Sequence, residues 1–459
     1  MFRTVLIAAV LSLVSWSTAA ESLTIVSSLP RTGSANAQTS SMINGIKMAI
    51  AEVGAKVTLG GVEHTIVYED WDDASPERGA WDPAVEAANA DKAIRNADVM
   101  AYIGTYNSGA AKIAMPKLNQ AGLAMISPAN TWPGLTKPGV GEANEPMVYR
   151  PAGNVSYFRV VPADDIQGAV GAQWAKELGA SKVFVLHDRE LYGQGIAKMF
   201  KLNAEKIGLT VVGFEGVDGK SGNFKSLINK IRSQKPELVY FGGTTETGAG
   251  QLAKDMIAGG LTAKLMGPDA FYNSALMTSA GDAALEGRVF ITFGGVPPEQ
   301  QTGKGKSFVD GYRMLYKTEP EGYAIYAYEA TKATIDAISR AGKKDRAAVL
   351  AALRATKDFD GALGKWSFDE NGDTTMMVMS GNTVKAGQFS FVKLLGDVAV
   401  AEAGKVFTTP TTTDHPPAVD TYGFNIPIIS TVIGLLGVVM VVIALIIRFL
   451  RRRKADEKG

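Results

Sequence analysis

Apolar strand-like runs alternate with helical patterns from residue 23 to about residue 293, and this alternation constrains the fold more than any other feature of the chain. Helical patterns lie between the runs, for example at residues 40–53, 84–96, 167–178 and 195–207. Strands that alternate with helices form parallel sheets joined by right-handed crossovers, so the sequence predicts an α/β architecture. The candidate strands are residues 23–29, 64–69, 99–103, 123–126, 158–161, 183–186, 211–214, 238–241, 265–266 and 289–293.

The number of these strands favours two sheets over one. An open sheet of ordinary size has about four to six strands, and the Pro- and Gly-rich residues 133–153 interrupt the alternation. A chain of 459 residues is long enough for more than one domain. We therefore expect two lobes, each built on a sheet of its own.

The composition excludes several classes of function. With no cysteine and three histidines, the chain cannot form disulfides, thiolate nucleophiles or cysteine–zinc sites, and a histidine-rich metal site is not expected. The formal net charge of +1, without basic clusters in the body, argues against a nucleic-acid partner. The acidic residues 69–73 lack the spacing of an EF-hand, and no phosphate-binding loop is present. We expect no cofactor and no metal.

Both ends of the chain carry membrane signals. Residues 1–20 combine a positive start at Arg3, an apolar core and a small-residue cleavage site, as in a secretory signal peptide. Residues 426–447 are apolar and uncharged, long enough to cross a bilayer core of ~30 Å, and a basic tail follows at residues 448–459. Together they predict an extracytoplasmic body, a Thr/Pro-rich linker at residues 401–425, one transmembrane helix and a cytoplasmic tail. A processed sorting signal is the alternative to a permanent anchor, although no Leu-Pro-x-Thr-Gly motif precedes the span.

Two neighbouring strand ends predict a binding pocket. The strand at residues 99–103 leads into Asn107-Ser108-Gly109, which opens a helical pattern, and the strand at residues 123–126 ends in a small polar turn that includes Thr131. In parallel α/β sheets ligands bind outside the carboxyl ends of the strands, where a helix N-terminus attracts an anion. These residues suggest a site for a small carboxylate; a helix cap at Ser108 and an ordinary turn at Thr131 are the alternative reading.

Short segments along residues 23–395 carry a family resemblance through their order and spacing. They read YIG with Ser108 (102–108), ISPANT (126–131), FR…DDIQG (158–168), HDRELYGQG (187–195), YFGG (240–243) and MGPD (266–269). In this arrangement they resemble the leucine/isoleucine/valine-binding family of periplasmic solute-binding proteins, which feed ABC importers. The resemblance implies the α/β two-lobe periplasmic-binding-protein type I fold, with two parallel doubly wound sheets, a three-strand hinge and the ligand between the lobes. Lobe 1 would comprise residues 21–162 and 292–378, and lobe 2 residues 163–291 and 379–400.

The resemblance also implies roles for single residues. Ser108 matches the serine whose hydroxyl and backbone N–H hold the ligand carboxylate. Ala129 and Thr131 match positions that contact the α-ammonium through a carbonyl and a hydroxyl, with the Thr131 N–H facing the carboxylate. Asp269 matches an acidic residue that pairs with the ammonium, and Tyr192 matches an aromatic wall. Two further cleft positions are Asp164 and Thr244.

These roles agree with what a zwitterion requires when it leaves water. Other residues of the chain depart from the family pattern. A buried zwitterion needs an anion site and a cation site, and placing Ser108 and Asp269 on opposite lobes would make full pairing depend on closure. Gln38 lies where branched-chain binders often have an aromatic residue, while Tyr106 and Trp132 add bulk or hydrogen bonding near the side-chain pocket. A polar amino acid, an amide or a urea-like compound is therefore an alternative ligand.

We expect a membrane-tethered solute-binding protein of an ABC importer, not an enzyme. Its ligand would be a branched-chain or similar amino acid or a related small amide, and its partners the ABC permease subunits. A sensory receptor ectodomain for the same ligand class is the alternative, although the tail at residues 448–459 is too short for a signalling domain. A secreted hydrolase would need a nucleophile, and no G-x-S-x-G turn accompanies His187-Asp188.

Overall fold

The computed structural model describes residues 21–219 and 222–396. The predicted signal peptide (1–20), linker (401–425), transmembrane helix (426–447) and tail (448–459) lie outside these residues. Among the helices that the structure does describe, none has both the length and the apolar character needed to cross a membrane.

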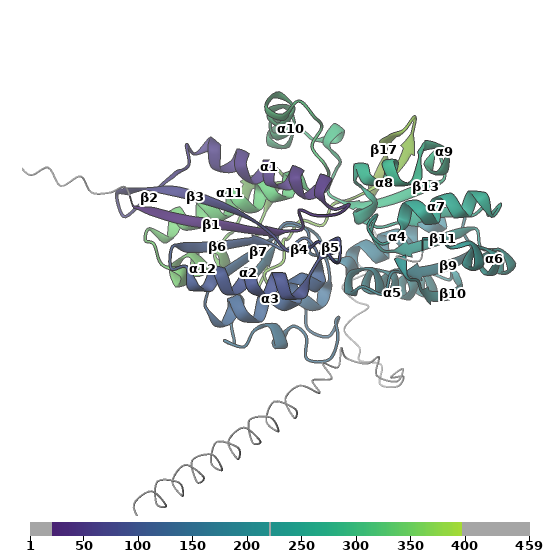
Figure 1. Cartoon of the computed structure of the whole chain (residues 1–459), viewed down its shortest axis with the longest axis horizontal. Coiled ribbons are helices and arrows are strands. Elements are labelled where there is room, and N and C mark those ends of the chain that lie inside the picture. Colours follow the sequence, from purple (N-terminus) through teal and green to yellow (C-terminus); the bar gives the residue numbers. More distant parts are fainter. Residues whose placement is uncertain (1–20, 220–221, 397–459) are drawn as a thin grey trace, which may run out of the picture. The chain divides into compact units, whose positions relative to one another are not determined.

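The first lobe is built on a six-stranded sheet with the order β2-β3-β1-β6-β7-β8 (Figure 1). Neighbouring strands run parallel, except that β2 and β3 are antiparallel. β6 and β7 are buried along their whole length because helices cover both faces of the sheet, which is typical of parallel sheets. The strands are β1 (Ser22–Leu29), β2 (Lys56–Leu59), β3 (Val62–Asp72), β6 (Val99–Gly104), β7 (Ala124–Ser127) and β8 (Tyr157–Arg159).

The helices of the first lobe pack in pairs, α1 against α11 and α2 against α3. Local sequence defines their ends: the Asp82 side chain caps α2 at its N-terminus with Pro83 as the first helical residue, and Gly342 ends α11 in the left-handed conformation. The helices are α1 (Asn36–Glu52), α2 (Pro83–Arg95), α3 (Ser108–Gln120), α10 (Gly303–Tyr316), α11 (Ala324–Ala341) and α12 (Arg346–Arg354).

The second lobe is built on a seven-stranded sheet with the order β10-β9-β11-β12-β13-β16-β17. Its strands are β9 (Lys182–His187), β10 (Thr210–Gly216), β11 (Leu238–Gly242), β12 (Lys264–Gly267), β13 (Val289–Gly294), β16 (Met379–Lys385) and β17 (Gln388–Leu395). Its helices are α4 (Asp164–Glu177), α5 (Leu191–Lys206), α6 (Lys225–Gln234), α7 (Ala249–Ala258), α8 (Ser274–Ala280) and α9 (Asp282–Leu285). α4 packs against α5, and α7 packs against α6 and α8.

The chain passes between the two sheets after β8, after β13 and again before β16. Two short hairpins also occur in the chain segments that belong to the first lobe. They are β4 (Ala74–Ser75) with β5 (Ala80–Trp81), and β14 (Phe359–Gly361) with β15 (Gly364–Trp366).

Every strand predicted up to residue 293 is present, and the two-lobe α/β fold is confirmed. The expectation that both sheets are parallel is wrong for one edge of each sheet: β2 pairs antiparallel with β3 in the first sheet, and the second sheet ends in an antiparallel edge. There β16 pairs antiparallel with both β13 and β17. The reason is local: a two-residue turn at Ala386 and Gly387, both with positive φ, joins β16 to β17, and such a tight turn can connect only antiparallel strands.

Candidate functional site

Residues that follow the carboxyl ends of strands in both lobes line one pocket of about 290 Å³, here called the inner pocket. The first lobe contributes residues that follow β6 and β7, together with the residue that precedes α11. The second lobe contributes residues that follow β9, β11 and β12. The lining residues are Tyr106, Asn107, Ser108, Ala129, Tyr192, Thr244, Ala270 and Tyr323.

The first-lobe wall of the inner pocket is suited to an anion. Ser108 is the first residue of α3, and no side chain caps this helix end. A helix N-terminus presents unpaired backbone N–H groups and the positive end of the helix dipole. The Ser108 hydroxyl accepts a hydrogen bond from the Trp132 backbone N–H at 3.3 Å, which brings the adjacent Thr131 to the same helix end. The Thr131 hydroxyl is buried and has no hydrogen-bond partner within the described residues.

The second lobe places a carboxylate directly behind the opposite wall. Asp269 follows β12 and is buried, and its carboxylate accepts hydrogen bonds from the hydroxyls of Tyr192 and Tyr323 and from the Ala270 N–H at 3.0 Å. Burial raises the pKa of the Asp269 carboxyl, while the tyrosine hydrogen bonds oppose that rise. Because Tyr323 belongs to the first lobe, its hydrogen bond to Asp269 also joins the two lobes.

A second carboxylate lies where the lobes meet. The Asp164 backbone N–H, at the start of α4, donates to the Thr131 carbonyl at 2.9 Å. The Asp164 side chain is completely buried, and within the described residues neither carboxylate oxygen has a hydrogen-bond partner. Burial raises the pKa of Asp164 well above its usual value and the charge of Asp269 raises it further, while the nearby Thr131 hydroxyl opposes the rise.

The structure brings most of the predicted site residues together. Among the predicted residues, those that line the inner pocket are Ser108, Ala129, Tyr192, Thr244 and Tyr106. Thr131, Asp164 and Asp269 are connected to the pocket wall by the hydrogen bonds described above. Gln38 does not line the inner pocket; it is buried in α1, and its side-chain amide has no partner among the described residues. The Trp132 ring lies against Gly195 of α5 instead of lining this pocket.

Sequence reasoning missed Tyr323 as a site residue. Tyr323 stands directly before α11, far along the chain from the strand ends that define the cleft. The only local signal is the beginning of a helical pattern, which does not indicate what the preceding side chain meets. Its contact with Asp269 depends on how the two lobes meet, so no local pattern could have found it.

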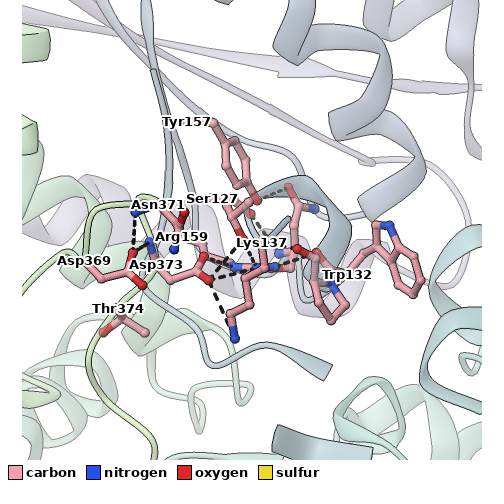
Figure 2. Close-up of polar contacts among 12 residues, drawn as sticks. Ser127, Trp132, Lys137, Tyr157, Arg159, Asp369, Asn371, Asp373 and Thr374 are labelled. Carbon is pink, nitrogen blue, oxygen red and sulfur yellow. Dashed lines mark hydrogen bonds and ion pairs between the residues drawn. The ribbon is translucent and has the colours of Figure 1, made fainter. Parts of the chain in front are cut away.

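An ion-pair network holds the loop that carries Thr131 (Figure 2). Arg159, at the end of β8, is completely buried and donates from Nε to Asp373 at 2.7 Å. Its Nη1 donates to the carbonyls of Asn130 and Trp132 at 3.3 and 2.8 Å, the residues on either side of Thr131. Burial opposes the charge of Asp373, but Arg159 holds the pKa of that carboxyl below its usual value. Arg159 therefore positions Thr131 at the pocket wall.

Beyond the inner pocket the cleft continues into a wider space of about 890 Å³, here called the outer chamber. The two share Asn107, Ser108, Tyr192 and Thr244 in their linings. The charged residues that line the outer chamber are Arg78, Asp188, Glu190, Asp218 and Glu246. Within residues 21–219 and 222–396, no group of three or more acidic or histidine side chains is arranged to hold a metal ion.

Comparison with known proteins identifies the family. Residues 22–388 match the family of periplasmic binding proteins, which is most of the chain. The chain belongs to that family. As a periplasmic binding protein it is a solute-binding protein and not an enzyme, and its body is extracytoplasmic.

Named relatives and solved structures agree with this assignment. A Leu/Ile/Val-binding protein homolog 2 from Brucella abortus is 32% identical over 348 residues, which are 76% of this chain and 86% of the relative. A leucine-, isoleucine-, valine-, threonine- and alanine-binding protein from Pseudomonas aeruginosa is 30% identical over 369 residues, 80% of this chain and 90% of the relative. The crystal structure of a leucine binding protein from Thermotoga maritima has a TM-score of 0.70 at 27% identity, covering 82% of this chain and 99% of that one.

Proposed function

We propose that this periplasmic binding protein captures a free amino acid, or a closely related small amide, between its lobes and delivers it to the permease of an ABC importer. The observation that carries the proposal is an uncapped helix N-terminus at Ser108 in the pocket wall together with the buried carboxylate of Asp269, which lies directly behind the lining residues Tyr192, Tyr323 and Ala270. A zwitterion satisfies both walls at once, whereas a ligand of a single charge leaves one buried polar wall unpaired.

The proposed roles follow from this pairing. The backbone N–H groups at the start of α3, with the hydroxyls of Ser108 and Thr131, would bind the ligand carboxylate. Asp269 and the Ala129 carbonyl would bind the α-ammonium, and Tyr192 would close over it from the second lobe. Because these groups belong to different lobes, ligand binding favours the closed arrangement. Asp164, Thr244, Tyr106 and Gln38 are proposed as further contacts around the ligand.

Relatives named for leucine, isoleucine, valine, threonine or alanine support an amino-acid ligand. They are named as binding proteins, which favours transport over a sensory receptor ectodomain. The gene neighbourhood discriminates the two, since permease genes accompany an importer and a kinase gene accompanies a receptor.

We also propose lobe limits of residues 21–162 with 292–378 and 163–291 with 379–400. Residues 1–20 would be a cleaved signal peptide, and residues 426–447 would anchor the protein in the membrane with residues 448–459 in the cytoplasm. The full-length protein should then sediment with the membrane fraction, and a chain truncated at Thr413 should be released. Full-length protein found free in solution would contradict the anchor.

Ligand-dependent thermal unfolding tests the proposed function. A tight ligand raises the melting temperature by mass action, so at least one free amino acid should stabilise the purified full-length protein. The variant Asp269→Ala should lose this stabilisation and bind the same amino acid ~2–5 kcal/mol more weakly by calorimetry, because it leaves a buried ammonium unpaired. Equal affinity of the variant and the native protein would contradict the role of Asp269, and no response to any amino acid would contradict the function.

A further inference from the structure

The cleft holds more carboxyl groups than a zwitterion needs. Asp218 lines the outer chamber, and five further acidic side chains lie in or beside the cleft: Asp164, Asp188, Glu190, Glu246 and Asp269. Within the described residues none of the five forms a salt bridge, although ion pairs are frequent elsewhere in both lobes, such as those of Asp165 and Asp373. One carboxylate is enough to pair with an α-ammonium, so the remaining carboxyl groups are available to a second cationic group.

The hydrogen bonds of these carboxylates come from neutral donors. Asp188 is buried and accepts from the Thr247 hydroxyl at 2.8 Å and from the Glu190 N–H at 2.9 Å. Asp269 accepts from tyrosine hydroxyls and one backbone N–H, and the buried Asp164 carboxylate accepts from no described donor. Burial raises the pKa of Asp188 and that of Glu246 to about 7. A cationic group of the ligand beside them would favour their ionised form.

The two spaces of the cleft place this charge beyond the amino-acid head group. Ser108 lines the inner pocket, and Asp269 lies behind its lining residues Tyr192, Tyr323 and Ala270. The inner pocket and the outer chamber share Tyr192 and Thr244 in their linings. Asp188, Glu190 and Glu246 line the outer chamber. A side chain that extends from the inner pocket into the outer chamber therefore meets these acidic residues.

Among residues 21–219 and 222–396, Arg78 is the one basic residue that lines the outer chamber. Its guanidinium lies over the Trp81 ring, 5.6 Å from the ring centroid, and it forms no ion pair with Asp188, Glu190 or Glu246 among the described residues. Within the part of the chain that the structure describes, Asp188, Glu190 and Glu246 thus form no ion pair. An excess of one sign of charge in a cleft also attracts ligands of the opposite charge.

The lining is poorly suited to a branched aliphatic side chain. Among the described residues that line the inner pocket, no aliphatic side chain is larger than alanine, and the apolar surface comes from Ala129, Ala270 and the rings of three tyrosines. Most small-molecule pockets are instead lined mainly by hydrophobic groups. Tyrosine rings accommodate methylene chains and attract cations to their faces.

We infer that the ligand is a cationic amino acid, with its head group in the inner pocket and its side-chain ammonium or guanidinium against Glu246 and Asp188 in the outer chamber. This inference rests on the proposed function and narrows its ligand class. Glu246 is then the residue that selects for charge, and Asp269 the residue that recognises the amino-acid head group.

Calorimetry on the purified full-length protein tests the inference with four probes: L-lysine, L-arginine, L-leucine and L-glutamine. Lysine or arginine should bind at least about tenfold more tightly than leucine and glutamine. The variant Glu246→Gln should reduce the preference for lysine over glutamine by about tenfold. The matched control is Glu286→Gln, an exposed glutamate of the second lobe, which should leave the preference unchanged.

The outcomes separate this inference from the function on which it rests. If leucine or glutamine binds as tightly as lysine and arginine, the inference is overturned. The proposed function is unaffected by that result. No binding of any probe, with no thermal stabilisation by any other amino acid, overturns the function itself. The four probes are compared on the native protein, so the test of ligand preference does not require that Glu246→Gln folds.

Discussion

Two buried carboxyl groups in the first lobe, those of Glu86 and Asp73, have raised pKa values because their charged forms are costly away from water. Glu86, in the first turn of α2, is buried and accepts hydrogen bonds from the Ser28 hydroxyl at 2.6 Å and the Tyr102 hydroxyl at 2.8 Å. Asp73 is equally buried, and its carboxylate has no partner among the described residues. Burial raises the pKa of Glu86 to about 8, and burial together with the charge of Glu86 raises the pKa of Asp73. At neutral pH the pair therefore retains protons.

This pair should make the protein less stable as the pH rises. A carboxyl with a raised pKa in the folded state contributes stability below its unfolded value, and that stability is lost as the pH rises through the folded value of about 8. One proton changes the free energy of unfolding by at most ~1.4 kcal/mol per pH unit. Glu86→Gln should therefore reduce the decline between pH 5 and pH 8, as followed by urea unfolding of the full-length protein. The exposed variant Glu286→Gln should keep the native slope; an undiminished slope in Glu86→Gln would count against the protonated pair.

Between elements, the Arg159–Asp373 pair connects the end of β8 to the segment before β16, close to two of the passages between the sheets (Figure 2). The Thr136 hydroxyl also donates to Asp373, at 3.0 Å. Lys137 continues the network to Asp165 of α4 at 2.7 Å, which brings a first-lobe loop to the second lobe. The network thus fixes the loop after β7 against both lobes.

Breaking this pair should cost much more than breaking an exposed one. Asp373→Asn leaves the buried Arg159 charge without its counter-ion, and we expect a loss of ~3–5 kcal/mol in the free energy of unfolding. Asp360→Asn breaks the exposed pair with Lys304 and should cost less than ~1 kcal/mol. Chemical unfolding measures both. Similar small losses in the two variants would show that the buried network contributes little.

At the scale of the whole described body, the two lobes meet through contacts that do not involve a ligand. Tyr323 donates to Asp269, the Asp164 N–H donates to the Thr131 carbonyl, and the Trp132 ring lies against Gly195 of α5. A Cβ atom on Gly195 would lie 2.4 Å from two atoms of that ring, so only glycine allows this approach. The close approach of the lobes thus depends on a glycine at position 195 as well as on hydrogen bonds.

Gly195→Ala should weaken ligand binding without destabilising the second lobe. The added methyl group keeps Trp132 away from α5 and disfavours closure, so we expect at least about tenfold lower affinity by calorimetry. The helical glycine Gly311 provides the control, because a Cβ there meets Met48 at an ordinary 3.4 Å. Gly311→Ala should bind like the native protein. Unchanged affinity in Gly195→Ala would mean that the lobes close without this contact.

Local patterns in the sequence were sufficient for the elements and for part of the site. The alternation of strands and helices predicted ten of the strands up to β13, in their correct order. These strands are recognisable because burial on both faces leaves a continuous apolar run in the sequence. The short strands β2, β4 and β5 were not predicted. Ser108 and Thr131 could be placed at neighbouring strand ends, since parallel strands end at one edge of a sheet. The strands β16 and β17 were not predicted as an antiparallel edge, because their direction depends on a tight turn and on pairing with β13.

Only the tertiary structure determined which distant residues meet. Tyr323 contacts Asp269, Arg159 contacts Asp373, and Trp132 contacts Gly195, all across long separations in the chain. Hydrophobic periodicity indicates which face of an element is buried, but it does not indicate which element packs on that face. The part of the pocket that follows Val99–Gly104 and begins the next helix could therefore be predicted from the sequence. The residues that close the pocket, and the acidic groups around it, depend on how the two lobes come together.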